Sequence, residues 1–457
     1  MKEVFAAPGN AGTAQIAHNL NIPTQIASSF RRRTRNDRGN VDALMKVVRE
    51  NKIDLTVVGP EAPLAEGIVD RFSAEGLPIF GATKAAAEIE TSKVFAKELM
   101  QKYKIPCAKS ASFSNFSEAK KYIQQQRPPI VIKADGLAAG KGVIIAESVP
   151  KAIEALSSFM ESKSLGAAGS KVVIEEFLNG KEMSAFVFTD GKTVVPVVPA
   201  CDYKRVFDGD QGPNTGGMGS YSPPYFLTPA LGKQVMETIM VPTVKALAAE
   251  GRPYRGVLYG GLMITPDGPA CHSSRLPELP PAGAPACRSS RGAAGRQGER
   301  RAGRGSGGQA GGAAGRPKAL EFNARFGDPE AQVILPRLKT DLIDIIFAIL
   351  ENKLAQMKIE WREDACVGVV MASGGYPGNY KTGFPIHGLN DVDKDIMVFH
   401  AGTKLSDGQV VTNGGRVLTV VATGKTVAEA RKKVYANITR ISFEGAHYRK
   451  DIALVRK

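Results

Sequence analysis

The alternation of apolar and polar residues is clearest in LEFNARFGDPE (Leu320–Glu330). Successive side chains of a β-strand point to opposite faces, so Glu321, Asn323 and Arg325 share one face. Their apolar neighbours occupy the other face. The pattern therefore predicts a strand with a buried side and a side that carries a carboxylate, an amide and a guanidinium.

Two segments upstream predict pairs of strands. IVIKADGLAAGKGVIIA (Ile130–Ala146) has an apolar run, a glycine-rich loop and a second apolar run, which predicts a hairpin. VVIEEFLNGKEMSAFV (Val172–Val187) predicts a buried strand that ends in Glu175 and Glu176, then a short connector and another strand. Both segments join strand to strand.

The ends of the chain show mixed helical and strand patterns. Near the start, a helix is expected at 42–51, a buried strand at 55–58 and one helix over PEAPLAEGIVDRF (60–72). The apolar run from Leu342 contains Asp344 and predicts an amphipathic helix. Strands near 366–371 and 417–421 and a helix at 427–438 are expected at the end.

The polar row on the 320–330 strand suits a nucleotide with a divalent cation. Mg²⁺ prefers oxygen ligands and commonly keeps one or two protein groups, so Glu321 and Asn323 suffice as the protein's share. The fork of Arg325 can hold a phosphate or carboxylate. An exposed strand face with polar residues would explain the same pattern, and this segment alone does not decide between the two.

The upstream segments offer matching chemistry. Gly140, Lys141 and Gly142 form a turn whose backbone N–H groups can approach phosphate, and Lys133 lies in the strand before it. The loop is neither a Walker A loop nor a GxGxxG crossover. The connector after Glu175 can offer backbone groups to an adenine edge and Glu182 to ribose hydroxyls. In isolation, both segments are equally compatible with ordinary surface hairpins.

Length and composition indicate a large enzyme. At 457 residues the chain exceeds one hydrophobic core, and its 43% hydrophobic content is ordinary for a globular protein. No apolar run approaches membrane-spanning length. Five cysteines without a CxxC pair favour a reducing, cytoplasmic location.

One segment supplies +6 of the net charge of +15. Residues 270–316 hold eight arginines against two glutamates, and their only aliphatic residues larger than alanine are Leu276 and Leu279. Such a segment cannot bury enough apolar surface to order itself, so we expect a disordered, trypsin-sensitive insertion. It lacks the interleaved aromatics of a nucleic-acid tail, which leaves nucleic acid as a remote alternative partner.

Taken together, these motifs resemble the ATP-grasp enzymes. Lys93 in ETSKVFAKELM, the AAGKG loop, EEFLNGKE and LEFNARFGDPE occur in the order of that superfamily. CDYKRVFDGDQGPNTGGMGSYSP (201–223), together with RFGDPE, narrows the resemblance to the phosphoribosylamine-glycine ligases. VVGPEAPLAEGIVD, APGNAGTA, MASGGYPGNY and TNGGRVL match the same family, so the resemblance spans nearly the whole chain.

The resemblance implies a multidomain fold of α/β and α+β type. We expect a doubly wound α/β domain at 1–91, an ATP-grasp domain at 92–340 interrupted by the 270–316 insertion, and a small α/β domain at 341–457. Family members open with a strand and a glycine loop before APGNAGTA, whereas here VFAAPGNAGTA begins at Val4. The first strand is expected to be missing, which would expose the edges of neighbouring strands.

The resemblance also implies the activity. It is ATP-dependent ligation of glycine to 5-phosphoribosylamine in purine biosynthesis, through a glycyl phosphate, by a monomer that uses Mg²⁺ or Mn²⁺. The implied residues fall into four groups. They are the catalytic Arg325, Asp202 and Arg205; the ATP-binding Lys93, Lys133, Gly140, Lys141, Gly142, Glu175, Glu176, Leu178 and Glu182; the substrate-binding Lys204, Asn214, Thr215, Gly216, Gly217 and Met218; and the metal-binding Glu321 and Asn323. Asn413 and Arg416 are further candidates.

Two alternatives stay close to this interpretation. One is another ATP-grasp ligase or carboxylase, which glycine would not stimulate. The other is a catalytically impaired relative that binds ATP without turnover.

Overall fold

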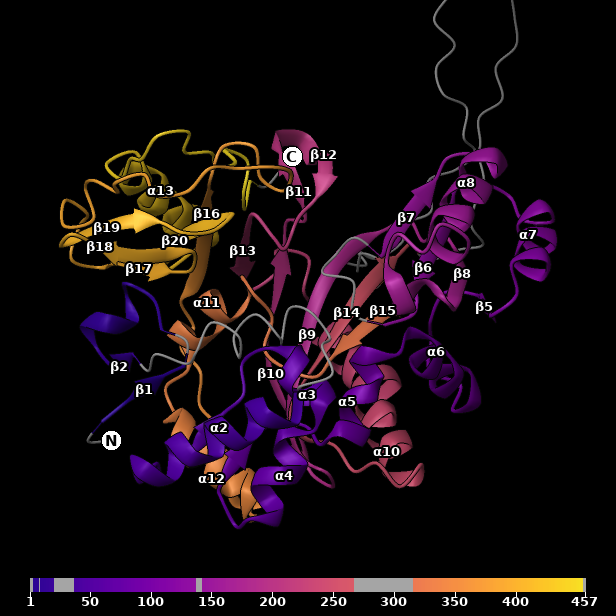
Figure 1. Cartoon of the computed structure of the whole chain (residues 1–457), viewed down its shortest axis with the longest axis horizontal. Helices are drawn as coiled ribbons and strands as arrows, with labels where there is room; N and C mark the ends of the chain where they lie inside the picture. Colours follow the sequence, from indigo (N-terminus) through magenta and orange to yellow (C-terminus); the bar gives the residue numbers. More distant parts are fainter. Residues whose placement is uncertain (1–2, 8, 20–36, 137–141, 267–314, 455–457) are drawn as a thin grey trace, which may run out of the picture.

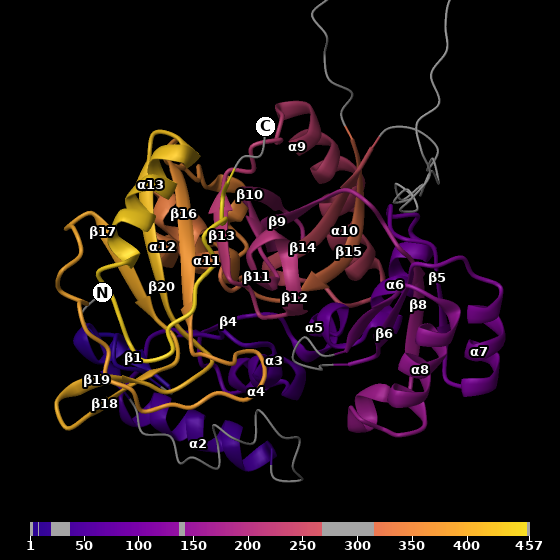
Figure 2. The same cartoon turned by 90° about the horizontal axis from the view of Figure 1, so that it is seen from above.

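The computed structural model describes residues 3–7, 9–19, 37–136, 142–266 and 315–454. An eight-stranded sheet forms its centre, and a smaller four-stranded sheet stands to one side. The lobe of α7 and α8 lies at one end of the large sheet and α13 at the other end (Figures 1 and 2). This arrangement agrees with the predicted combination of α/β and α+β domains.

The N-terminal part contains short parallel strands and helices. Its elements are β1 (Phe5–Ala6), β2 (His18–Asn19), α2 (Asp37–Glu50), β3 (Thr56–Val57), α3 (Glu61–Glu66), α4 (Ile68–Ala74), β4 (Ile79–Phe80) and α5 (Lys84–Thr91). β1 pairs with β2 and β3 with β4, and each pair forms its own two-stranded sheet. Parallel pairing is what a doubly wound domain requires.

Two sequence predictions in this part need correction. The single helix expected over 60–72 is divided into α3 and α4, because Gly67 adopts a left-handed conformation with φ of 85°. The strand expected at 55–58 is shorter and less buried than predicted, since Val57 is 50% exposed. The apolar residues of LTVV (55–58) are therefore not all buried.

The smaller sheet has the order β5-β8-β6-β7 and is antiparallel. Its strands are β5 (Ser110–Phe113), β6 (Ile130–Ala134), β7 (Val143–Ala146) and β8 (Val172–Glu176), which follow α6 (Lys93–Lys102). The helices α7 (Phe116–Gln124) and α8 (Val149–Met160) share one core with this sheet. The hairpin predicted at 130–146 is confirmed, with Lys133 opposite Val143.

The large sheet has the order β15-β14-β9-β10-β13-β16-β20-β17. Its first part consists of β9 (Lys181–Asp190), β10 (Val194–Asp202), β13 (Gly219–Ser222), β14 (Arg255–Thr265) and β15 (Arg316–Asn323), and β11 (Arg205–Phe207) and β12 (Gln211–Asn214) form a separate hairpin. Along β9, Val187 belongs to one core and Phe188 to another. The sheet is therefore covered on both faces.

Helices pack on each face of this sheet. On the Val187 side lie α6, α9 (Pro229–Val235) and α10 (Val241–Ala249), and a π-helical turn joins α9 to α10. On the Phe188 side lie α11 (Ala331–Ile334) and α12 (Leu342–Leu350). The sequence predicted α12 as an amphipathic helix, and its apolar residues face this core.

The C-terminal part continues the same sheet through the pairing of β13 with β16. Its elements are β16 (Ala365–Ala372), β17 (Ile396–His400), β18 (Thr403–Ser406), β19 (Gln409–Thr412), β20 (Arg416–Gly424) and α13 (Val427–Ile438). The predicted strands near 366 and 417 and the helix at 427–438 are confirmed. The predicted domain boundaries at 91 and 340 stay predictions.

The hairpin of β14 and β15 carries the long connection between them. Thr265 pairs with Arg316, so both strands are complete up to the connection. The expected insertion therefore ends earlier than predicted, since Arg316 is the first residue of β15. Residues 267–314, which hold the rest of it, lie outside the described residues.

Deletion of residues 269–314 is expected to leave the fold intact. The remaining Pro266, Asp267, Gly268 and Gly315 suit a turn between the paired ends of the strands. Each doubling of loop length costs about 0.6 kcal/mol, so the free energy of unfolding should rise by about 2 kcal/mol or less. Urea unfolding of both proteins measures this, and a lower midpoint in the shortened protein would contradict the prediction.

Among the described residues, no helix is both long and apolar enough to cross a membrane. Cys107, Cys201 and Cys366 are free thiols.

Candidate functional site

A cavity of about 820 Å³ lies between the small sheet and the first half of the large sheet. Its size is typical of small-molecule sites. It gathers residues from both sheets, from α5 and α6, and from the C-terminal part. The sequence-predicted residues that line it are Lys93, Lys133, Gly142, Glu175, Glu176, Leu178, Glu182, Asp202, Lys204, Asn214, Thr215, Gly216, Glu321, Asn323, Arg325 and Arg416.

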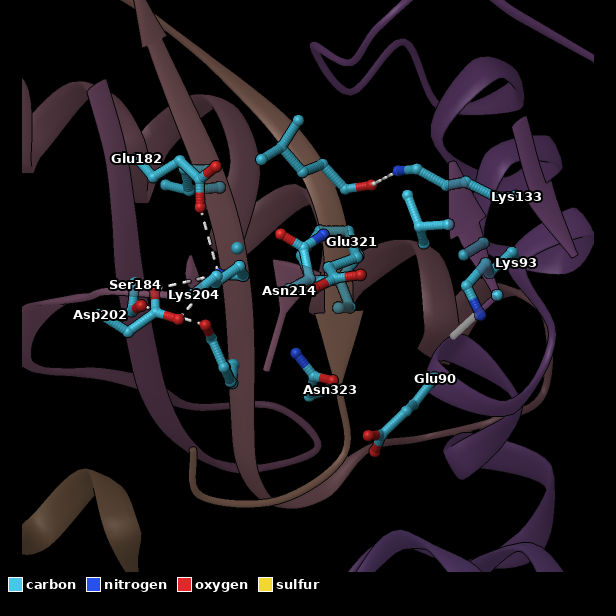
Figure 3. Close-up of a pocket in the computed structure, with 18 of the residues that line it drawn as sticks. Glu90, Lys93, Lys133, Glu182, Ser184, Asp202, Lys204, Asn214, Glu321 and Asn323 are labelled. Carbon is cyan, nitrogen blue, oxygen red and sulfur yellow. Dashed lines mark hydrogen bonds and ion pairs between the residues drawn. The ribbon is translucent and has the colours of Figure 1, made fainter. Parts of the chain in front are cut away.

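Glu321 and Asn323 lie at the centre of this cavity, in sequence along β15 (Figure 3). Strand alternation puts both on the cavity side, as the sequence predicts. Opposite Glu321 on β14 stands Gly261, where an added Cβ would come within 3.3 Å of the Glu321 side chain. Glycine at 261 therefore leaves the room that the carboxylate occupies.

The surroundings of Glu321 keep it ionised. Burial acts to raise the pKa of Glu321, but Lys133, Lys204 and Lys93 outweigh it and lower the pKa below its ordinary value. An ionised carboxylate and an amide oxygen are hard ligands that suit Mg²⁺. Among the described residues, no cluster of three His, Cys, Asp or Glu could hold a metal. A cation here would complete its shell from phosphate and water.

Two lysines form the wall that faces Glu321. Ser92 caps α6, its Oγ accepting a hydrogen bond from the Phe95 N–H, which places Lys93 at the first turn. The ammonium of Lys93 donates to the Gly136 carbonyl at 3.0 Å, and burial lowers the pKa of Lys93. Lys133 on β6 donates to the Leu320 carbonyl at 3.2 Å. Both cations therefore stand beside the strand that carries Glu321.

Lys97 is a residue of this wall that the sequence interpretation missed. Its Nζ lies 3.1 Å from one oxygen of Glu175, and the Nζ of Lys133 lies 3.1 Å from the other oxygen. All three side chains are buried. The side chain of Glu175 thus holds two lysines, whereas only the backbone of its connector was expected to take part. The signal was present, because Lys97 follows Lys93 by one helical turn.

The opposite wall is built around Lys204. Its Nζ donates to both oxygens of Asp202, at 3.0 and 2.9 Å, and to Glu182 at 3.2 Å. Burial acts to lower the pKa of Lys204, but Asp202 and Glu182 outweigh it and hold the pKa well above its ordinary value. Figure 3 shows these three residues on one side of the cavity, across from Lys93 and Lys133.

Behind Asp202 lies a second feature that sequence reasoning missed. Ser184 donates to Glu330 at 3.1 Å and lies 3.0 Å from the hydroxyl of Tyr259. Burial, followed by the charge of Asp202, raises the pKa of Glu330 to about 7. Glu330 ends the same LEFNARFGDPE segment that carries the metal-binding candidates. The cavity therefore contains a carboxyl group that can exchange a proton near neutral pH.

Arg325 is held by carboxylates of the N-terminal part. Its guanidinium lies 3.2 Å from Glu90 and 3.3 Å from Glu61. Glu90 also accepts a hydrogen bond from the Ala324 N–H at 2.7 Å, and burial, offset in part by Arg325, raises its pKa to about 7. The sequence prediction gave Arg325 an anionic ligand, and neither carboxylate partner was foreseen.

Apolar side chains from both sheets also line the cavity. Phe177 and Ile145 are 41% and 38% exposed although they are large and apolar. The other members of this apolar wall are Val131, Leu178, Leu262, Met263 and Leu320. An apolar lining of this kind fits a flat apolar ring better than it fits a charged group.

Four predicted residues do not line the cavity, namely Arg205, Gly217, Met218 and Asn413. The backbone N–H of Asn413 donates to the Gly402 carbonyl at 2.7 Å. The guanidinium of Arg205 donates to the Gly212 carbonyl at 2.7 Å within the β11–β12 hairpin. Met218 is fully buried against Val206 and Ala372, and Gly217 packs on Pro329. Arg205 thus bonds within its own hairpin, whereas Gly217 and Met218 pack against protein groups, and the ligand contacts expected for them stay predictions. Gly140 and Lys141 lie outside the described residues.

Comparison with known proteins gives a consistent match along the chain. Residues 1–90, 91–273 and 366–455 match the N, ATP-grasp (A) and C domains of phosphoribosylglycinamide synthetase. The phosphoribosylamine–glycine ligase of Halalkalibacterium halodurans is 44% identical over 453 residues, which are 99% of this chain and 91% of the relative.

Solved structures agree. A phosphoribosylamine–glycine ligase from Thermotoga maritima has a TM-score of 0.74 and 32% identity, with 98% of this chain and 94% of that chain covered. A biotin carboxylase domain from Hydrogenobacter thermophilus, solved with MgADP, ADP and bicarbonate, has a TM-score of 0.68 at 13% identity, over 98% and 86% of the two chains. The second likeness concerns the fold alone.

Proposed function

The chain belongs to the phosphoribosylglycinamide synthetase family, and we propose that the cavity between its two sheets is the active site. The chain is an ATP-dependent carboxylate–amine ligase of purine biosynthesis. In the reaction, glycine and 5-phosphoribosylamine are joined to glycinamide ribonucleotide while ATP becomes ADP and phosphate.

The reaction sets three requirements for the site. A carboxylate is a poor acyl donor, so the glycine carboxylate first attacks the γ-phosphorus of ATP and forms glycyl phosphate. The amine of phosphoribosylamine then attacks the acyl carbon, and phosphate leaves with the electron pair of the C–O bond. The site must hold phosphate charge, orient two substrates and accept a proton from the amine.

We assign the nucleotide to the side of the small sheet. The apolar wall around Phe177 and Ile145 would take the adenine ring, and Lys93 and Lys133 would neutralise the phosphates. Glu176 and Leu178 also line the cavity, and Glu182 lines it from the opposite wall beside Lys204. Gly142, which precedes β7, lines the cavity near Lys133.

Glu321 and Asn323 would hold Mg²⁺, with Mn²⁺ as an alternative. The cation supplies charge stabilisation for phosphoryl transfer when it is bound. The lowered pKa of Glu321 supports this role, because a metal ligand must be deprotonated.

We assign glycine and phosphoribosylamine to the side of the large sheet. Asp202 and Lys204 offer a carboxylate and an ammonium, which complement the amino and carboxylate groups of glycine. Asn214, Thr215 and Gly216 border the same wall, and Arg325 would face the reacting carboxylate. Glu330, with a pKa near 7, is suited to take the proton released by the amine.

One observation carries the proposal. Glu321 has a lowered pKa among several cations in a cavity that has both an apolar wall and an ion-paired wall. That is the charge pattern needed for a metal nucleotide beside a zwitterionic amino acid. We further propose a monomer that acts without nucleic acid, as the family resemblance implies. The free thiols are consistent with a cytoplasmic enzyme.

The direct test is ADP release from ATP with glycine and freshly made phosphoribosylamine. We expect release that requires both substrates, together with formation of the amide product. Stimulation by bicarbonate in place of glycine would indicate a carboxylase instead. ATP binding without turnover would mark an impaired relative.

A further inference from the structure

Arg416, the first residue of β20, connects two loops at the mouth of the cavity. Its NH1 group donates to the Gly216 carbonyl at 2.8 Å and to the Asp328 carbonyl at 3.0 Å. Its NH2 group donates to the Asp328 carboxylate at 2.6 Å. One guanidinium from the C-terminal part thus holds both the loop of the predicted substrate residues and the segment that follows β15.

Tyr376, which follows β16, holds the same loop from a second point. Its hydroxyl accepts a hydrogen bond from the Gly216 N–H at 3.0 Å. Both backbone groups of Gly216 are therefore bound by side chains of the C-terminal part. The far side of the loop is fixed to the segment between β10 and β11, where Thr215 donates through its hydroxyl to the Lys204 carbonyl at 2.8 Å.

The glycines of this loop are required by these contacts. A Cβ at Gly216 would lie 3.0 Å from the guanidinium of Arg416. Gly217 has a φ of 110°, and a Cβ there would lie 2.4 Å from the Pro329 ring. Gly415 similarly leaves room for Tyr376, since its Cβ would come within 2.3 Å of the ring. The family resemblance placed Gly216 and Gly217 among the substrate-binding residues, and the geometry gives both glycines close contacts with protein groups.

We propose that Arg416 and Tyr376 are positioning residues that make the C-terminal part a component of the substrate site. Together they hold Asn214, Thr215 and Gly216 against the wall formed by Asp202 and Lys204. Lysine could not replace Arg416, because a single ammonium cannot reach two carbonyls and a carboxylate in one plane. The expected change in kcat/KM for glycine rests on the proposed function. The expected loosening of the loop that contains Gly216 does not.

The test compares Arg416→Lys and Tyr376→Phe with the control Arg440→Lys. Arg440 is a matched control because it also bonds a carbonyl, of Asp391, and a carboxylate, of Asp393, and it does not line the cavity. We expect Arg416→Lys to reduce kcat/KM for glycine by about tenfold or more, since a small misplacement of binding groups is costly. ATP affinity and the Arg440→Lys kinetics should stay within about twofold of wild type.

Hydrogen exchange of the peptide that contains Gly216 and Gly217 supplies a readout independent of turnover. Exchange should accelerate in both cavity variants and stay unchanged in Arg440→Lys. Unchanged exchange in Arg416→Lys and Tyr376→Phe would overturn the proposal, even if activity falls, because Arg416 would then act on the substrate itself. Should Arg416→Lys fail to fold, Tyr376→Phe decides by the same criteria. Failure of the proposed function is distinct, since it would appear as wild-type protein without glycine-dependent ADP release.

Discussion

Glu321→Ala is expected to lose at least about a hundredfold in turnover while the protein remains folded. Glu321 is the only carboxylate on the cavity face of β15 in the part of the chain that the structure describes. Several cations lower its pKa, and its removal takes away the charged ligand that we assign to Mg²⁺. The remaining amide of Asn323 cannot replace that charge.

The measurement is ADP release at saturating substrates, combined with thermal unfolding of each variant. Glu321→Gln tests charge alone because it keeps the shape of the side chain. Glu237→Gln is the control. Glu237 is exposed, and its carboxylate lies 3.8 Å from the ammonium of Lys233, one helical turn earlier. A folded Glu321→Ala protein with nearly normal ADP release would rule out the metal assignment.

The second large effect is expected for Lys133→Met, which should weaken ATP binding by about tenfold or more, as expected for loss of a charged hydrogen bond. Lys133 is buried beside β15, where its ammonium can neutralise phosphate. Loss of Lys133 does not leave Glu175 without a cationic partner, because Lys97 still lies 3.1 Å from that carboxylate. The structure therefore predicts a binding defect with little loss of folding stability.

Calorimetry with ATP and Mg²⁺ in the absence of glycine measures this effect without turnover. Glycine affinity should be retained, since Lys133 lies across the cavity from Asp202 and Lys204 (Figure 3). Lys151→Met on the exposed surface of α8 serves as the control within the same lobe. Unchanged ATP affinity in Lys133→Met would show that this lysine only pairs with Glu175.

Local periodicity was sufficient for much of the fold. The strand that carries Glu321 and Asn323, the hairpin around Lys133 and the helix at 427–438 follow from spacing alone, because each depends on the conformation of consecutive residues. The order of the motifs along the chain was sufficient for the family. Local patterns were less reliable where a single glycine broke a helix, as at Gly67, or where an apolar strand stayed exposed, as at Val57.

Partners distant along the chain could not be foreseen in the same way. Arg205 and Arg416 are both arginines in polar segments, yet the first bonds its own hairpin while the second joins Gly216 to Asp328. Arg325 similarly receives Glu61 and Glu90 from the N-terminal part. A residue's spacing reports the face on which it lies, but not which element folds against that face.

The sequence by itself therefore established most of the strands and helices and the family, and it placed Glu321 and Asn323 on one face of their strand, because these depend on local geometry and motif order. Only the folded chain established the lysine pair around Glu175, the proton-exchanging Glu330 and the contacts of Arg416. These arise where side chains from separate elements are buried together, and burial and charge then set their partners and pKa values.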